Sequence, residues 1–175
     1  MKITDFRKYL QSLSKEEMED ELINLVKSYR DVKEYFSLKV NPENGEEIFL
    51  KYKGNIKNQF FTKKFYGNPN FREIRGYYLA FKKISKNIEY LIELMLYTVE
   101  LAMKYLDEVG CWEERFYTSI CKILEEAFIV IQKNKFGEKY VDRCRKIVES
   151  SRSKDYGIYD LMYDDFYHYF GIELD

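Results

Sequence analysis

The stretch that decides the fold is residues 87–109, NIEYLIELMLYTVELAMKYLDEV. On a helix, where successive residues turn by about 100°, most of its charged side chains gather on one narrow stripe. That stripe consists of Glu89, Glu93, Glu100 and Lys104. Apolar side chains cover the remaining circumference, which is typical of a helix with neighbours on several sides. We therefore predict a long central helix here, ended by Gly110.

Helical periodicity extends from this segment toward both ends of the chain. Across residues 113–133 the apolar residues recur three and four positions apart, which predicts a second long helix. The sequence Ser14-Lys15-Glu16-Glu17 has the form of a capping box, in which a serine and a glutamate together cap the start of a helix. Shorter helices are predicted over 6–13, 15–29, 31–39, 46–61, 71–86, 138–150 and 158–170.

No segment alternates apolar and polar residues for long enough to predict a strand. We therefore predict an all-α fold, a single compact domain of about eight or nine helices with the two long helices at its centre. The domain spans residues 1–175, of which 1–40 form an N-terminal helical hairpin region and 41–175 the main helical body. A chain of this length buries about 70% of its unfolded surface, so it needs no disulfide or metal to fold.

Composition excludes several classes of protein. An apolar fraction of 46% with two prolines and eight glycines excludes a disordered or low-complexity chain. The three cysteines, Cys111, Cys121 and Cys144, have the spacing of neither a zinc site nor a disulfide framework. The N-terminus lacks the apolar stretch of a signal peptide, and the longest apolar or neutral run, 94–99, is far shorter than a membrane span. We predict a cytoplasmic protein with reduced cysteines, no cofactor and no membrane segment.

Charge is divided unequally along the chain. Residues 51–86 contain ten Lys or Arg, one acid and nine aromatic residues, a net charge of +9 in a chain whose formal net charge is −1. The cations of this basic window are Lys51, Lys53, Lys57, Lys63, Lys64, Arg72, Arg75, Lys82, Lys83 and Lys86. Because cations bind phosphate and aromatic faces stack on bases, the mixture is typical of a nucleic-acid-binding segment.

A helical projection of residues 71–86 separates the two kinds of side chain. The cations fall within an arc of about 100°, interrupted by Leu79 alone, and we name them the basic ridge. The basic ridge consists of Arg72, Arg75, Lys82, Lys83 and Lys86. The aromatic rings lie on the opposite side, where we expect them in the core. The ridge is thus a candidate binding surface for phosphates or an acidic partner. The alternative is an ordinary solvated face, or one neutralised by the chain's own acids.

The last predicted helix carries a possible metal-binding pattern. Asp160, Asp164 and His168 are four residues apart and line one face, and carboxylate and imidazole groups are ligands of transition metals. A two-metal site in a helix bundle needs a second His, whereas this chain has one His. We therefore predict a polar surface here and no metal site.

Asp165 falls on the apolar face of the same helix. A buried carboxylate needs a cation or several hydrogen-bond donors. We predict a structural salt bridge to Arg115, Arg143 or Arg145, which would make Asp165→Asn more destabilising than Asp160→Asn.

Several segments resemble an uncharacterised bacterial family that is known only as a domain of unknown function. They are Leu94 to Glu100, Arg115 to Tyr117, Arg143 to Val148, Asp160 to Phe170 and, near the N-terminus, Leu10 to Glu16. The resemblance implies an intracellular helical protein and supplies no activity.

No catalytic residue is predicted, because no phosphate-binding loop, nucleophile elbow or paired His and nucleophile is recognisable. We expect an interaction or adaptor protein that binds a protein partner, or a second copy of itself, through a charged helical surface. Segment 155–175, with six acids and no Lys or Arg, could meet the basic window of such a copy. The alternative is a nucleic-acid-binding protein that uses residues 72–86. A third hypothesis is a carboxylate enzyme centred on Asp160, Asp164 and His168.

Overall fold

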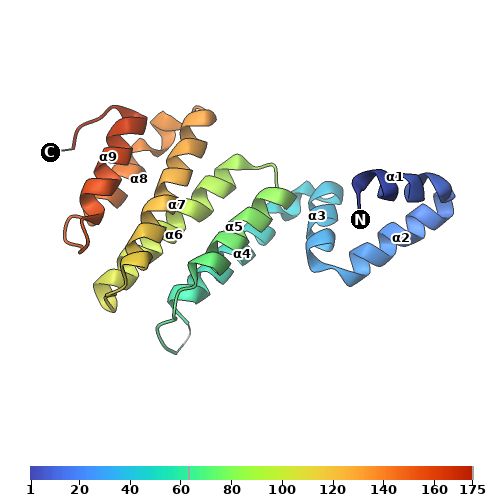
Figure 1. Ribbon diagram of the computed structural model, residues 1–175, viewed down its shortest axis with the longest axis horizontal. Helices are drawn as coiled ribbons and strands as arrows, with labels where there is room; N and C mark the ends of the chain where they lie inside the picture. The colour runs from blue at the N-terminus through green and yellow to red at the C-terminus, as the bar shows by residue number, and fades with distance from the viewer. Residues whose placement is uncertain (63, 175) are drawn as a thin grey trace. The chain divides into compact units, whose positions relative to one another are not determined.

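The computed structural model describes residues 1–62 and 64–174, and this part of the chain is all-α, as predicted (Figure 1). Its helices are α1 (Ile3–Ser12), α2 (Lys15–Ser28), α3 (Arg30–Val40), the short 3-10 helix η1 (Pro42–Asn44), α4 (Gly45–Phe60), α5 (Phe71–Ile84), α6 (Ile88–Glu108), α7 (Glu114–Lys133), α8 (Gly137–Ser150) and α9 (Ile158–Phe170). The β-type pairing among these residues is one isolated bridge between Phe61 and Tyr66. Lys63 of the basic window lies outside the described residues.

The chain divides into two compact units, Met1–Glu46 and Glu47–Asp175, which we call unit 1 and unit 2. The division falls close to the predicted boundary at residue 40. That the two regions form a single domain stays a prediction.

Unit 1 owes its helices to local interactions. The predicted capping box is confirmed: the Ser14 hydroxyl accepts from the Glu17 amide at 3.2 Å, and the Ser14 amide donates to the Glu17 carboxylate at 2.7 Å. The Tyr9 hydroxyl donates to Glu21 at 3.0 Å and so connects α1 to α2. Neither α1 nor α2 contains a buried residue. Capping and helix propensity therefore shape this unit more than a hydrophobic core does.

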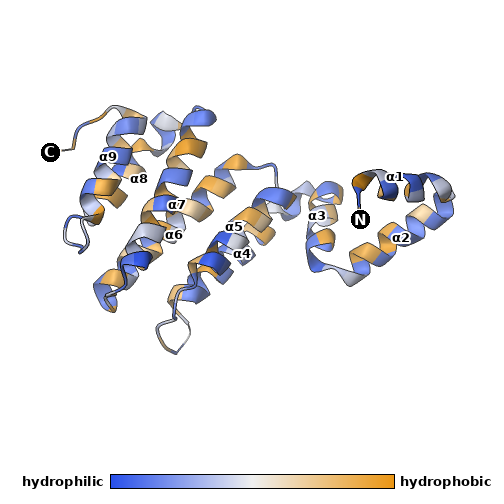
Figure 2. Ribbon diagram, in the orientation of Figure 1, coloured by the Kyte–Doolittle hydropathy of each residue, from blue (hydrophilic) through white to orange (hydrophobic). Residues whose placement is uncertain are grey.

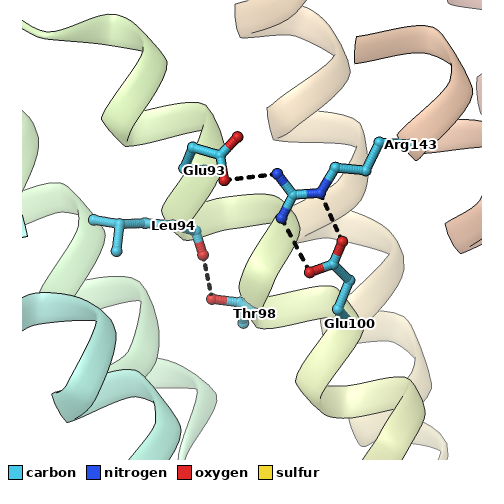
Figure 3. Close-up of polar contacts among 5 residues, drawn as sticks. All are labelled: Glu93, Leu94, Thr98, Glu100 and Arg143. Carbon is cyan, nitrogen blue, oxygen red and sulfur yellow. Dashed lines mark hydrogen bonds and ion pairs between the residues drawn. The ribbon is translucent and has the colours of Figure 1, made fainter. Parts of the chain in front are cut away.

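Unit 2 is built around the predicted pair of long helices, α6 and α7, which pack against each other. In Figure 1, α4 and α5 lie on one side of this pair and α8 and α9 on the other. The helices carry hydrophilic and hydrophobic residues side by side, as amphipathic helices do (Figure 2). On α6 the buried residues run around most of the circumference. One of them, Thr98, satisfies its buried hydroxyl by donating to the Leu94 carbonyl at 2.7 Å (Figure 3).

Aromatic side chains fill the space between α4, α5 and α6. Phe49 of α4 stacks on Tyr90 of α6 with 4.4 Å between ring centroids, and Phe81 of α5 meets Tyr52 edge to face at 5.5 Å. At the other end of α4, the fully buried Phe60 contacts Tyr105 at 6.0 Å. Each buried ring removes about 150–250 Å² from water, so this cluster is a large part of the core.

The connection from α4 to α5 requires a glycine. A Cβ at Gly67 would collide with the carbonyl group of Gln59. The Gly67 amide donates to the Phe60 carbonyl at 2.7 Å, and its own carbonyl accepts from the Tyr105 hydroxyl at 3.1 Å. The connection is thereby held against both α4 and α6.

The polar stripe of α6 is matched by cations of α8. Arg143 donates from Nη1 to Glu93 at 2.7 Å, and from Nε and Nη2 to the two oxygens of Glu100 at 2.6 and 3.0 Å (Figure 3). One turn earlier, Lys139 pairs with Glu89 at 2.6 Å. About a third or less of the side-chain surface of Arg143, Glu93 and Glu100 is exposed, so this group is partly shielded from water. The bidentate geometry fixes the position of α8 on α6.

We expect Arg143→Met to lower the free energy of unfolding by about 1–3 kcal/mol, because two half-buried carboxylates would lose their shared cation. Lys139→Met is the matched control, since it also removes an α8 cation paired with an α6 glutamate. Its pair is more exposed, 55% and 42%, so its loss should be below about 1 kcal/mol. Urea denaturation measures both, and equal losses would show that the Arg143 group does not hold α8 in place.

Candidate functional site: a basic-rimmed groove between α5, α6 and α7

The side chains of α5 are arranged as the helical projection predicted, with a buried apolar face and exposed cations. Asn70 caps the helix by accepting from the amides of Arg72 and Glu73 at 3.0 and 3.2 Å. Ile74, Tyr78 and Phe81 are buried. The cations of the helix, Arg72, Arg75, Lys82 and Lys83, are all exposed.

One residue of the basic ridge is not on this helix. Helix α5 ends at Ile84, and Ser85 has an extended backbone with φ −109° and ψ 137°. The Ser85 hydroxyl accepts from the Asn87 amide at 3.1 Å, and Asn87 in turn caps α6 by accepting from the Tyr90 amide at 3.2 Å. The prediction of a helix through Lys86 is therefore wrong, because two capping residues break it. Lys86 lies exposed in the connection.

Arg75 is already engaged by the chain itself. Its Nε and Nη2 atoms lie 3.1 and 2.7 Å from one carboxylate oxygen of Glu126 on α7, whose other oxygen accepts from the Tyr78 hydroxyl at 2.9 Å. The hydrogen bond to Glu126 raises the pKa of Arg75. Burial, followed by the hydrogen bond to Glu126, raises the pKa of Tyr78, so this phenol stays protonated. The ridge is thus neutralised at Arg75.

A groove opens beside this ion pair, with a volume of about 270 Å³. Leu91 and Met95 of α6 form its buried floor, and Leu79, Ile129 and Val130 line its walls. Its polar lining consists of Arg75, Tyr78, Lys82 and Glu126. Leu79, which interrupts the ridge in the projection, is therefore a half-buried wall residue. The groove combines an apolar interior with a charged rim.

The other cations of the ridge are not paired with the chain's own acids among the described residues. Within residues 1–62 and 64–174, Arg72, Lys82, Lys83 and Lys86 form no ion pair. The one acid of the window, Glu73, accepts from the Gln59 side chain at 3.0 Å instead. The basic window therefore presents net positive charge to solvent beside the groove.

The aromatic residues of the window are divided between core and surface. Tyr52, Phe60, Tyr78 and Phe81 are buried, so their faces are not available to a base. In the connection between α4 and α5, however, Phe65 is 77% exposed and Tyr66 54% exposed, next to the exposed Lys64. The rings of this connection are therefore accessible for stacking on bases, whereas the buried rings of Tyr78 and Phe81 on α5 are not.

A second pocket, of about 280 Å³, lies where α6 turns into α7. Its lining includes Asp107 and Lys154, which form an ion pair with each other, and the backbone turn at Cys111. Trp112 at its edge is 88% exposed. Since its lysine is already paired, this pocket offers less unsatisfied charge than the groove.

Two of the three cysteines are chemically inert. Burial is the main cause that raises the pKa of both Cys121 and Cys144 to about 12. The thiolate, which is the nucleophilic form, is therefore scarcely populated at neutral pH. All three cysteines are free.

The last helix does not assemble the predicted polar groups into a site. Asp160, Asp164 and His168 are all exposed, and the described part of the chain has no group of three or more His, Cys, Asp or Glu side chains placed to hold a metal ion.

Asp165 differs from its predicted role. It is half-buried, forms no ion pair within the described residues, and Arg143, one of its three expected partners, binds Glu93 and Glu100 instead. Its desolvation, with the nearby charges of Glu125 and Asp164, raises its pKa. The prediction of a buried salt bridge is therefore wrong. The apolar face of α9 packs on α7, and the charged residue of α7 near Asp165 is Glu125 and not a cation.

The site residues that the sequence analysis missed come from α6 and α7. Glu126, Ile129 and Val130 belong to a different helix from the ridge, and the sequence contains no local signal that places them beside Arg75. The separation of Arg75 and Glu126, 51 residues, shows why periodicity alone cannot join them.

Among the described residues, no helix is both long and apolar enough to cross a bilayer. A family model described as a family of unknown function, DUF6155, matches residues 1–167. The chain belongs to this family. No curated protein and no solved structure matches it. Membership of DUF6155 thus agrees with the resemblance seen in the sequence and brings no activity with it.

We expect Asp165→Asn to raise the melting temperature at pH 7 by about 1–2 °C. A raised pKa in the folded state means that the stabilising form is the protonated one. That contribution is present below the ordinary pKa of aspartate and is lost as the pH rises through the raised value, so the ionised carboxylate is unfavourable at pH 7. The gain should vanish below about pH 4.

Asp160→Asn is the control, since Asp160 is exposed in the first turn of α9, where a carboxylate favours the helix dipole. It should leave the melting temperature unchanged or slightly lower. A lower melting temperature for Asp165→Asn than for Asp160→Asn at pH 7 would restore the salt-bridge interpretation.

Proposed function

We propose that this DUF6155 protein is a non-catalytic interaction or adaptor protein that binds an acidic partner segment along the groove between α5, α6 and α7. The observation that carries the proposal is that Lys82 lines the groove, while three more cations of the basic ridge, without an ion pair among the described residues, lie exposed on α5 or directly after it. These are Arg72, Lys83 and Lys86.

The groove supports a protein partner better than a bare polyanion. Leu79, Ile129 and Val130 give it partly exposed apolar walls, and Ile129 is 44% exposed. Apolar walls gain affinity by burying apolar side chains, while a cationic rim selects acidic sequences and speeds their association. An amphipathic acidic helix or peptide has both features.

Our proposal places the protein in the cytoplasm of a bacterial cell. The free cysteines support a reducing compartment, and the family resemblance supports a bacterial source.

Nucleic-acid binding is the second candidate function, favoured by one specific observation. Phe65 and Tyr66 expose their rings beside Lys64, and the ridge residues Arg72, Lys82 and Lys83 are exposed cations. Such a surface could stack on unpaired bases while the ridge contacts phosphates. It would not need the apolar groove.

The double variant Lys82→Glu/Lys83→Glu tests the acidic-partner function. Labelled poly-L-glutamate is the probe, and fluorescence anisotropy at submicromolar protein and about 50 mM salt measures its affinity. We expect the variant to bind about tenfold more weakly than wild type, because each reversal replaces attraction by repulsion. Lys122→Glu/Lys146→Glu, which changes the same charge at exposed lysines of α7 and α8, is the control. Equal losses of polyglutamate affinity in both variants would show that net charge alone causes the effect. The ridge would then not be the binding site.

The same assay with a single-stranded oligonucleotide separates the second candidate. Phe65→Ala/Tyr66→Ala should weaken oligonucleotide binding by about tenfold or more if bases stack there, and leave polyglutamate binding unchanged. If wild type does not bind the oligonucleotide at about 50 mM salt, nucleic-acid binding is excluded, and if it binds with an affinity that salt does not reduce, phosphate contacts by the ridge are excluded.

A further inference from the structure

Helix α2 carries an apolar stripe that is partly exposed to solvent. On the helix, Leu22 and Leu25 lie three residues apart and are 42% and 37% exposed, and Tyr29, the C-cap residue that follows with an extended backbone, is 59% exposed. Neither α1 nor α2 buries a single residue. Small helical units are stabilised when such apolar faces are buried. We therefore expect the stripe to bind a partner.

The charge of α2 is opposite to that of the basic ridge. Its sequence Lys15–Ser28, KEEMEDELINLVKS, contains five acids and two lysines, a net charge of −3. Residues 71–86, which contain the ridge, contain five cations and one acid, a net charge of +4. Most of the acids lie in the first half of α2, ahead of the apolar stripe, so α2 has the acidic and apolar character that the groove accepts.

The groove also suits the size of the stripe. An apolar cavity of about 150 Å³ accepts a ligand as large as benzene, so the groove, at about 270 Å³, has room for one or two side-chain anchors. Anchors three or four residues apart belong to the pattern by which a helix binds in a groove, and Leu22 and Leu25 of α2 have that spacing.

We infer that α2 of one copy binds the groove of a second copy, so that the protein forms a reciprocal dimer. This inference rests on the proposed function and names the acidic partner segment as the chain's own α2. Each copy supplies one α2 and one groove, so a two-fold dimer would satisfy both pairings and leave neither surface open. The exposed stripe of unit 1 and the ridge lysines Lys82 and Lys83 of unit 2, which form no ion pair among the described residues, then have one common explanation.

Charge reversal on either side tests the inference. The α2 variant is Glu19→Lys/Glu21→Lys, which alters the two exposed acids on either side of the stripe and leaves the capping residue Glu17 intact. The groove variant is Lys82→Glu/Lys83→Glu. We expect sedimentation equilibrium at micromolar concentration to give wild type about twice the chain mass of 21.3 kDa and each variant about the chain mass. Each reversal should raise the dimer dissociation constant at least tenfold.

Mixing the two variants is the decisive step. In a mixed dimer the basic α2 meets the acidic groove and the acidic α2 meets the basic groove, so both pairings are favourable. An equimolar mixture should therefore return to the dimer mass. A dimer that survives both reversals, or a mixture that stays monomeric although each variant has dissociated, overturns the inference.

A pair of apolar variants tests the stripe without changing charge. Leu25→Gln should dissociate the dimer, whereas Ile23→Gln, 49% exposed and turned by about 200° from Leu25, should not. Leu25→Gln should also bind polyglutamate at least as tightly as wild type, because its groove is free. Circular dichroism confirms that both variants keep their helices.

These measurements separate the two proposals. A monomeric wild type that binds polyglutamate through the ridge overturns self-pairing alone. A monomeric wild type that does not bind polyglutamate overturns the self-pairing and the acidic-partner function together.

Discussion

The apolar surface of α6 is the constraint on which the rest of unit 2 depends. Helices α5, α7 and α8 all pack against it, and α4 reaches it through the stacked rings of Phe49 and Tyr90. A helix that is apolar over most of its circumference leaves one narrow stripe for charges. The carboxylates of that stripe, Glu89, Glu93 and Glu100, are met by two cations of α8. The core helix thus also determines where α8 lies.

This arrangement has an electrostatic consequence for the surface. Three acids of α6, Glu89, Glu93 and Glu100, are engaged by Lys139 and Arg143 of α8, and Glu126 of α7 is engaged by Arg75 of α5. A half-buried, bidentate pair holds its charges far more tightly than an exposed one does. These four carboxylates are therefore not free to neutralise Lys82 and Lys83. The positive charge of the basic window stays uncompensated by these carboxylates because they pair with the cations that join the helices.

Local rules predicted most of the helices, because periodicity and capping act over a few residues. The capping box at Ser14 and the span of α9 follow from such rules. The errors arose where a helix meets another helix or a second cap. Lys86 lies beyond α5 because Ser85 and Asn87 cap in succession, and Asp165 lacks its cation because α7 faces it with Glu125. The groove could not be predicted for the same reason, since its walls come from α5 and α7, two helices far apart in the sequence that both pack on α6.

The energetics of unit 1 favour paired rather than single docking. Fully burying an exposed leucine contributes about 1.5–3 kcal/mol, and Leu22 and Leu25 are already more than half covered, so one α2 in one groove gains only part of that. Association costs at least about 4 kcal/mol in lost translational and rotational freedom. Two reciprocal sites incur this cost once while doubling the buried apolar area and the charge contacts. A helix as weakly anchored as α2 therefore gains most where two copies exchange it.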